Sequence, residues 1–182
     1  MRCFLAVDLN KDLAKQVKEI QNEIISMNLD IKLVEPENLH FTLKFLGEVE
    51  EDEVDVIKKS VERGLRGNYV FKINIQGLCY FGSPKHIKTL WLDVDEGKDD
   101  FVKLVKNMND CLNIGEKNKS PHLTIGRVKS GRNRDLLLDF INKHKDVKIG
   151  EMAVKDVKLK SSVLTRNGPV YTDLAVFKLG GN

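Results

Sequence analysis

Residues 40–47 read HFTLKFLG, and residues 122–128 read HLTIGRV. Each stretch begins with histidine, an apolar residue, threonine and a second apolar residue. Side chains two apart share a face of a β-strand, so the histidine and the threonine lie on one face and the apolar residues on the other. A single His-x-Thr carries little information because threonine is common in strands. Two copies in similar surroundings predict two equivalent strands.

The first stretch lies within a regular series of expected elements. The helices are indicated by apolar residues three or four apart, and the strands by alternation or by short apolar runs. We expect a strand at FLAVDL (4–9), followed by a helix that Asn10 caps and whose apolar face carries Leu13, Val17, Ile20 and Ile24. The HFTLKFLG strand comes next. A second helix, with Val54, Ile57, Val61 and Leu65 on one face, ends at Gly67 and precedes the strand YVFKINIQG (69–77).

The second stretch lies within the same series. We expect a strand at TLWLDV (89–94), a helix with Phe101, Leu104, Val105, Met108 and Leu112 that ends near Gly115, the HLTIGRV strand, a shorter helix around Leu136, Leu137, Phe140 and Ile141, and strand residues from 149 to 159. The alternation slips near Lys155 and Asp156, which indicates a β-bulge. A turn at Gly168 and Pro169 begins a last strand, GPVYTDLAVFKL (168–179).

The repeated order predicts a duplicated unit. No linker rich in Pro, Gly or Ser separates the halves, so we expect one two-lobed domain over residues 1–182, with an internal repeat of roughly 1–87 and 88–182. Tandem half-domains commonly place equivalent residues across a pseudo-twofold cleft. This arrangement would bring His40 and His122 face to face.

Composition excludes several classes of protein. The chain has 182 residues, of which 41% are hydrophobic and 31% are charged, which does not indicate disorder. No apolar run is long enough for a membrane span, and Asp8 falls where a signal peptide would be apolar. We therefore expect a cytoplasmic protein that does not bind membranes. Cys3, Cys79 and Cys111 are widely spaced, so we expect reduced, buried thiols and neither a disulfide framework nor a zinc knuckle.

Charge is unevenly distributed although the net charge is only +3. The acidic run EVEEDEVD (48–55) begins a helix that carries basic residues toward its end, which matches the helix dipole. Between Gly115 and Arg166, lysine and arginine outnumber the acidic residues. This basic half could attract a polyanion such as RNA, or it could be a solvated lysine-rich face.

Paired imidazoles and hydroxyls suit displacement at phosphorus. Attack and departure occur on opposite sides of the phosphate, so one imidazole can take a proton from water while the other protonates the leaving oxygen. The two hydroxyls can donate to the non-bridging oxygens. No cofactor is needed, and we expect no metal, because no third ligand stands at a zinc-site spacing and no phosphate-binding glycine motif occurs. His86 and His144 lie among lysines, and we expect both at the surface.

In these residues the chain resembles the two-histidine phosphoesterase superfamily, and within it the RNA 2',3'-cyclic phosphodiesterase (2'-5' RNA ligase) family. The resemblance runs nearly end to end, through MRCFLAVDL, EPENLHFTLKFLGEV, SPHLTIGRV and GPVYTDLAVFKL. It implies an α+β, bilobal fold with two antiparallel sheets that flank a V-shaped, positively lined cleft, with helices outside. It also implies metal-independent hydrolysis of a terminal 2',3'-cyclic phosphate to a 2'-phosphate, with reversible 2'-5' ligation at the same site.

The resemblance also assigns roles to single residues. His40 would be the general acid and His122 the general base, while Thr42 and Thr124 would hold the phosphate. Two further positions each lie five residues past a histidine: Phe45 follows His40, and Arg127 follows His122. Arg127 would contact the phosphate and Phe45 would stack on a base. An odd spacing in a regular strand points both to the opposite face, so Phe45 could equally be a core residue, and Arg127 would need a strand end or twist near Gly126.

The expected partner is RNA with a 2',3'-cyclic phosphate end, such as a tRNA fragment, bound by a monomer. One alternative is a 2'-5' oligonucleotide phosphodiesterase or a 3'-end RNA-processing nuclease of the same superfamily. Another is a non-catalytic RNA-binding module that keeps the cleft.

Overall fold

The computed structural model describes residues 1–117, 120–166 and 168–181, and within them it contains four α-helices and ten β-strands. The helices are α1 (Lys11–Ser26), α2 (Val54–Gly64), α3 (Lys98–Cys111) and α4 (Arg134–Lys143), with two 3-10 helices, η1 (Pro36–Asn38) and η2 (Glu51–Glu53). The strands are β1 (Arg2–Asp8), β2 (Ile31–Leu33), β3 (His40–Glu48), β4 (Phe71–Ser83), β5 (His86–Val94), β6 (Glu116–Lys117), β7 (Leu123–Val128), β8 (Lys148–Val154), β9 (Asp156–Thr165) and β10 (Gly168–Lys178).

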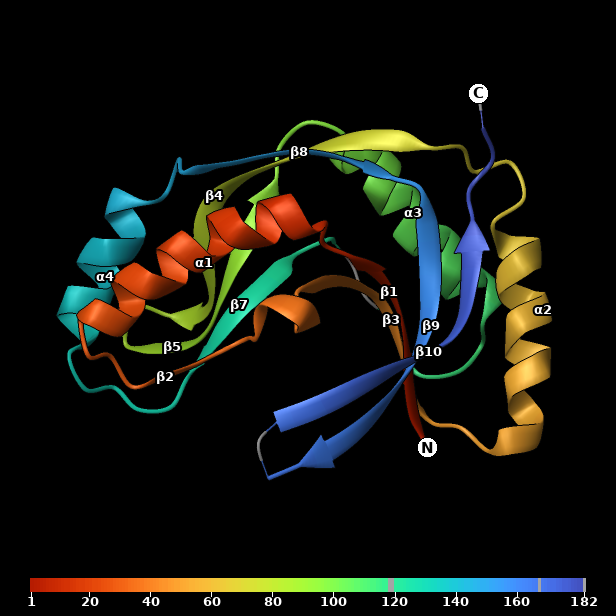
Figure 1. Cartoon of the computed structure of the whole chain (residues 1–182), viewed down its shortest axis with the longest axis horizontal. Helices are drawn as coiled ribbons and strands as arrows, with labels where there is room; N and C mark the ends of the chain where they lie inside the picture. The colour runs from red at the N-terminus through yellow and green to blue at the C-terminus, as the bar shows by residue number, and fades with distance from the viewer. Residues whose placement is uncertain (118–119, 167, 182) are drawn as a thin grey trace.

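The strands form two antiparallel groups that share one edge. The order along the sheet is β10-β9-β1-β3-β7-β5-β4-β8, and among the described residues only the pair Phe41 and Leu123 joins β3 to β7. We call β10-β9-β1-β3 the first lobe and β7-β5-β4-β8 the second lobe. Helices α2 and α3 cover the first lobe, whereas α1 and α4 cover the second (Figure 1). The expected α+β, two-lobed architecture with outer helices is therefore confirmed.

The lobes are not the two halves of the sequence. Strand β4 belongs to the first half of the chain but pairs with β5 and β8 of the second half. Strand β9 belongs to the second half but pairs with β1. The short strands exchange as well, since β2 pairs with β7 and β6 pairs with β3. Each half thus contributes strands to both lobes.

The helices and strands follow the physical signals in the sequence. The apolar face of α1 is buried, and the Asn10 side chain accepts a hydrogen bond of 2.8 Å from the Leu13 amide at its start. In β3, Phe41 is fully buried and its ring lies 5.1 Å from that of Phe101 on α3. Among the described helices, none combines the length and the apolar character that a bilayer span requires.

The expectations for residues 155–156 and for His144 were wrong, and Cys79 and Cys111 are half-buried rather than buried. The slip near Lys155 and Asp156 is not a bulge within one strand; it is the break between β8 and β9, where the chain passes from the second lobe to the first. His144 is not at the surface: it is 8% exposed. Its Nδ1 lies 2.9 Å from the Phe140 carbonyl oxygen and its Nε2 lies 3.3 Å from Glu23 of α1. These partners come from another turn and another helix, which the lysine-rich local sequence does not reveal.

Candidate active site

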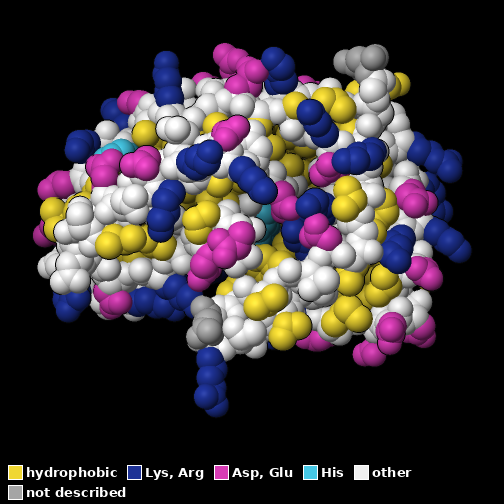
Figure 2. Space-filling model, in the orientation of Figure 1, with side chains coloured by type: hydrophobic (Ala, Val, Ile, Leu, Met, Phe, Trp, Pro, Cys, Tyr) yellow, Lys and Arg dark blue, Asp and Glu magenta, His cyan; other side chains and the backbone are white. Residues whose placement is uncertain are grey.

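The seam between the lobes places the two His-x-Thr motifs together. Phe41 and Leu123, the pair that joins β3 to β7, each directly follow a histidine. Neighbouring residues in a strand point to opposite faces, so the residues on either side of this buried pair face away from the core. They are His40, Thr42, His122 and Thr124, and all four line one cavity of about 670 Å³. Figure 2 shows histidine, basic and acidic side chains in the hollow between the lobes.

Both imidazoles are held in the same way. Nδ1 of His40 lies 2.7 Å from the carbonyl oxygen of Asn38, and Nδ1 of His122 lies 3.1 Å from that of Ser120. A carbonyl oxygen only accepts hydrogen bonds, so Nδ1 carries a proton in each ring. Nε2 is then the nitrogen that gains or loses a proton. In His40 this atom lies 3.1 Å from the Thr42 hydroxyl oxygen.

Aromatic rings contact each histidine. The ring of His40 lies 5.0 Å from that of Phe4 on β1 and 5.4 Å from that of Tyr171 on β10, and these two rings also contact each other at 5.0 Å. His122 contacts two rings of the second lobe that stack on each other at 4.9 Å, and these are Phe81 of β4 and Trp91 of β5. Sequence reasoning missed these four aromatic residues. Alternation along FLAVDL could have indicated Phe4, but the others depend on strands brought together from distant parts of the chain.

Burial controls the protonation of both rings. Burial lowers the pKa of His40 below its ordinary value, against the hydrogen bond to Asn38 and the charge of Asp8, which raise it. The charges of Lys160 and of His122 lower the pKa of His40 further. Burial also lowers the pKa of His122, as does the charge of Arg127, whereas its hydrogen bond to Ser120 raises it. Both imidazoles therefore lose a proton at a lower pH than a histidine of ordinary pKa does.

A bulge in β3 brings Phe45 to the cleft. In the pairing of β1 with β3, Leu5 lies opposite Lys44 and Ala6 lies opposite Thr42, so Leu43 has no direct partner. The extra residue reverses the alternation. Phe45 is therefore 47% exposed and lines the cavity with His40 and Thr42. The alternative interpretation of Phe45 as a core residue was wrong.

A second bulge at the equivalent place brings Arg127 to the cleft. In the pairing of β5 with β7, Leu90 lies opposite Gly126 and Trp91 opposite Thr124, so Ile125 is the extra residue. Arg127 consequently lines the same cavity as Thr124. In each motif the bulged residue directly follows the threonine, which explains how a residue five past the histidine returns to its face.

A buried amide supports the second bulge. Gln21 of α1 is fully buried, and its Nε2 donates to the carbonyl oxygens of Val34 and Ile125 at 2.8 and 3.0 Å. Val34 lines the cavity and Ile125 is the bulged residue of β7. Gln21 therefore connects α1 to two neighbouring backbone segments near Arg127, which are themselves joined by a hydrogen bond from the Val34 amide to the Ile125 carbonyl oxygen. Its place on the apolar face of α1 was the one sequence signal for such a role.

The cleft is rich in cations. Arg2, Lys32, Arg127 and Lys129 line it, together with Glu35. Lys32 and Arg127 lie opposite each other in the pairing of β2 with β7. Arg2 is paired with Glu48 at 3.1 Å. In the described part of the chain, no cluster of three or more His, Cys, Asp and Glu side chains is arranged to hold a metal ion.

Comparison with known proteins relates this geometry to one family. The family model of LigT-like phosphoesterases matches the chain twice in succession, at residues 7–91 and 92–171. An RNA 2',3'-cyclic phosphodiesterase of Methanothermobacter thermautotrophicus is 44% identical over 183 residues, with 98% of this chain and 99% of that protein covered. A protein of the same name from Archaeoglobus fulgidus is 37% identical, with 98% and 100% covered. A crystal structure from Thermus thermophilus superposes with a TM-score of 0.82 at 27% identity and covers both chains completely.

Proposed function

Because the chain belongs to the LigT-like phosphoesterase family, we propose that it hydrolyses the 2',3'-cyclic phosphate at the end of an RNA to a 2'-phosphate. The observation that carries this proposal is the pair of imidazoles in one cavity, each with Nδ1 fixed by a backbone carbonyl and Nε2 available for proton transfer. The names of the similar archaeal proteins support the same reaction.

The reaction is an in-line displacement at phosphorus. Nε2 of neutral His122 takes a proton from water as the water oxygen attacks the phosphorus atom. The bond from phosphorus to the 3' oxygen breaks, and Nε2 of protonated His40 gives its proton to that oxygen. The product keeps the phosphate on the 2' oxygen. His122 gains one proton and His40 loses one, so the net charge of the enzyme does not change in this step.

Four further side chains hold the substrate. The Thr42 and Thr124 hydroxyls donate to the non-bridging oxygens, and Arg127 neutralises their charge. Phe45, exposed at the cavity wall, stacks on a base. We propose RNA fragments, such as cleaved tRNA, as substrates for a monomer in the cytoplasm. The repeat of roughly residues 1–87 and 88–182, which two successive family matches support, supplies one acid–base residue from each half.

The same site can use a 5' hydroxyl in place of water. His122 then takes the proton of the 5' hydroxyl as its oxygen attacks the phosphorus atom, and His40 protonates the leaving 3' oxygen, which gives a 2'-5' linkage. In the reverse direction the 3' hydroxyl attacks this linkage, the 5' oxygen leaves, and the two histidines exchange roles. Both directions need only two imidazoles for proton transfer, so we propose that neither requires a metal. Ligation is tested by incubating RNA with a cyclic phosphate end and RNA with a 5' hydroxyl, and by looking for a joined 2'-5' product.

The central experiment uses an oligoribonucleotide with a 2',3'-cyclic phosphate in excess EDTA. We expect release of a 2'-phosphate end, and we expect His40→Ala and His122→Ala each to lower kcat by roughly 10²- to 10⁴-fold. His86→Ala, on an exposed residue outside the cavity, is the matched control and should leave kcat unchanged.

Other outcomes would redirect or overturn the proposal. Cleavage of internal or 2'-5' linkages alone would identify another branch of the superfamily. RNA binding without turnover would identify a non-catalytic module. Unchanged kcat in both histidine variants would exclude the paired-histidine mechanism.

A further inference from the structure

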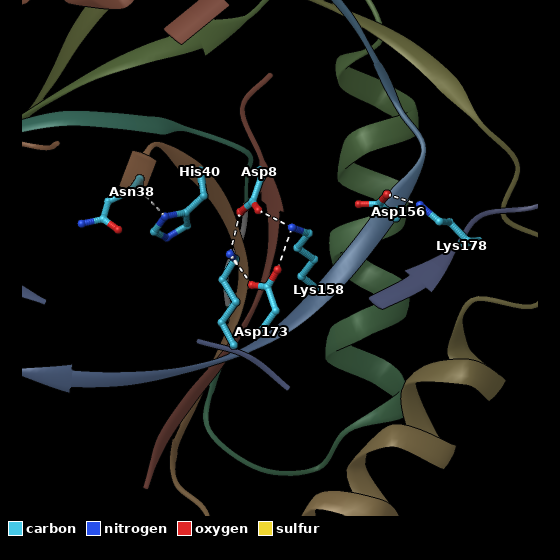
Figure 3. A network of polar contacts seen from close by, with 8 residues as sticks. Asp8, Asn38, His40, Asp156, Lys158, Asp173 and Lys178 are labelled. Carbon is cyan, nitrogen blue, oxygen red and sulfur yellow. Dashed lines mark hydrogen bonds and ion pairs between the residues drawn. The ribbon is translucent and has the colours of Figure 1, made fainter. Parts of the chain in front are cut away.

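A closed ring of four charged side chains lies beside the cleft in the first lobe. Lys158 Nζ contacts Asp8 at 2.8 Å and Asp173 at 2.7 Å, and Lys160 Nζ contacts Asp8 at 3.1 Å and Asp173 at 2.6 Å. The residues come from β1, β9 and β10 (Figure 3). The Lys160 side chain is only 9% exposed, whereas those of Lys158, Asp8 and Asp173 are 23%, 33% and 37% exposed, so the ring is partly shielded from solvent.

The ring adjoins His40. Asp8 and His40 are direct cross-strand partners in the pairing of β1 with β3, and Figure 3 shows their side chains side by side. Directly opposed residues of an antiparallel pair have Cβ atoms about 4.5–5.5 Å apart and share a face of the sheet. A carboxylate at this distance favours the charged form of an imidazole.

The second lobe has a different arrangement around His122. Asp93 has the same place in TLWLDV that Asp8 has in FLAVDL, but it pairs with Lys98 at 2.9 Å. The charge that acts on His122 is the cation of Arg127. The two histidines therefore stand in unlike electrostatic surroundings although their motifs are alike.

The geometry points to Asp8 as a positioning residue that favours the imidazolium form of His40, with Lys158 and Lys160 holding its carboxylate in place. This inference rests on the proposed function, because a general acid must carry a proton and burial by itself disfavours that form of His40. It also gives a physical reason for which histidine is the acid: His40 faces a carboxylate, whereas His122 faces a guanidinium.

The groups around His40 act in both directions. Burial lowers the pKa of His40 most strongly; the charge of Asp8 on β1 raises it, while the charges of Lys160 on β9 and of His122 beside β7 lower it. Tyr171 of β10 contacts the ring edge-on, and burial raises the pKa of its hydroxyl, so it stays neutral. Burial opposes the charge on Lys158, but its hydrogen bonds to Asp173 and Asp8 raise its pKa overall. Burial likewise opposes the charge on Asp173, but hydrogen bonds from Lys158 and Lys160 lower its pKa overall.

The test is a titration of the histidine ring signals by NMR, assigned with single His→Gln variants. In Asp8→Asn, we expect the His40 midpoint to move to lower pH. In Lys160→Met, we expect it to move to higher pH. Asp173→Asn is the matched control: it breaks the same ring but keeps Asp8 and Lys160, the two ring members whose charges act on His40, so the His40 midpoint should move much less.

Turnover gives a second readout. Asp8→Asn should lower kcat most at alkaline pH, because His40 of the variant loses its proton at lower pH than His40 of the wild type. The expected loss is about tenfold or less. Removal of a general acid would lower kcat by roughly 10²-fold or more. The inference would be overturned if the His40 midpoint moved equally in Asp8→Asn and Asp173→Asn, or if it did not move in Asp8→Asn. If Asp8→Asn does not fold, an unmoved midpoint in Lys160→Met overturns it. The titration needs no substrate, so failure of the proposed reaction would be seen separately.

Discussion

At the scale of single residues, the two histidines differ in what surrounds them. The backbone fixes both rings identically, through a carbonyl two residues earlier. Their charged neighbours differ, since Asp8 favours a proton on His40 and Arg127 disfavours one on His122. In the proposed reaction, the rate rises with pH as the base loses its proton and falls as the acid loses its own. We therefore expect a bell-shaped dependence of kcat/KM on pH.

Two replacements of Arg127 test separately the effect of its charge on His122 and the effect of its planar guanidinium on substrate binding. Because Arg127 lowers the pKa of His122, Arg127→Met should move the His122 midpoint to higher pH, as NMR would measure. It should also raise KM by roughly 10- to 150-fold, since a hydrogen bond to a charged group contributes roughly 1.5–3 kcal/mol. Arg127→Lys keeps the cation but not the planar fork, so its His122 midpoint should stay near that of the wild type while KM still rises. An unmoved midpoint in Arg127→Met would show that its charge does not reach His122.

At the scale of elements, one extra residue in each motif strand determines the composition of the site. Without the bulges at Leu43 and Ile125, strict alternation would turn Phe45 and Arg127 away from the cleft. Both bulges directly follow the threonine, so the two repeats share this irregularity. Gln21 supports the bulge of β7 from α1.

Two phenylalanines of β3 provide a matched comparison. Phe45→Ala should raise KM about tenfold, since a stacked base contributes roughly 1–3 kcal/mol, and should change the free energy of unfolding by no more than about 0.5 kcal/mol. Phe41→Ala should lower that free energy by about 3–5 kcal/mol, because Phe41 is fully buried against Phe101. Urea unfolding and steady-state kinetics measure both. A large loss of stability in Phe45→Ala would contradict the exposed position.

At the scale of the whole molecule, exchange of strands between the halves makes the lobes interdependent. Strand β4 completes the second lobe, and β9 with β10 completes the first. Neither half contains a full sheet, although each contains a full His-x-Thr motif. The cleft therefore exists only when both halves are folded together.

Cutting the chain in the turn between β4 and β5 tests this dependence. We expect residues 1–84 and 85–182, made separately, to lack cooperative unfolding, because each would expose sheet edges and apolar faces that the other covers. Mixed together, they should recover a cooperative transition in circular dichroism and cyclic phosphodiesterase activity. A cooperatively folded isolated half would contradict the interdependence of the lobes.

Periodicity and motif spacing are local properties, and they were enough to predict the order of the elements, the two motif strands and the face that carries His40, Thr42, His122 and Thr124. The face on which Phe45 and Arg127 lie, the exchange of strands between lobes, the burial of His144 and the ring at Asp8 became visible only in the folded chain. These features depend on contacts and register between segments that are far apart in the sequence. A single bulged residue turns the later side chains of its strand to the opposite face of the sheet, and an ion pair between two strands forms only when the fold places those strands side by side.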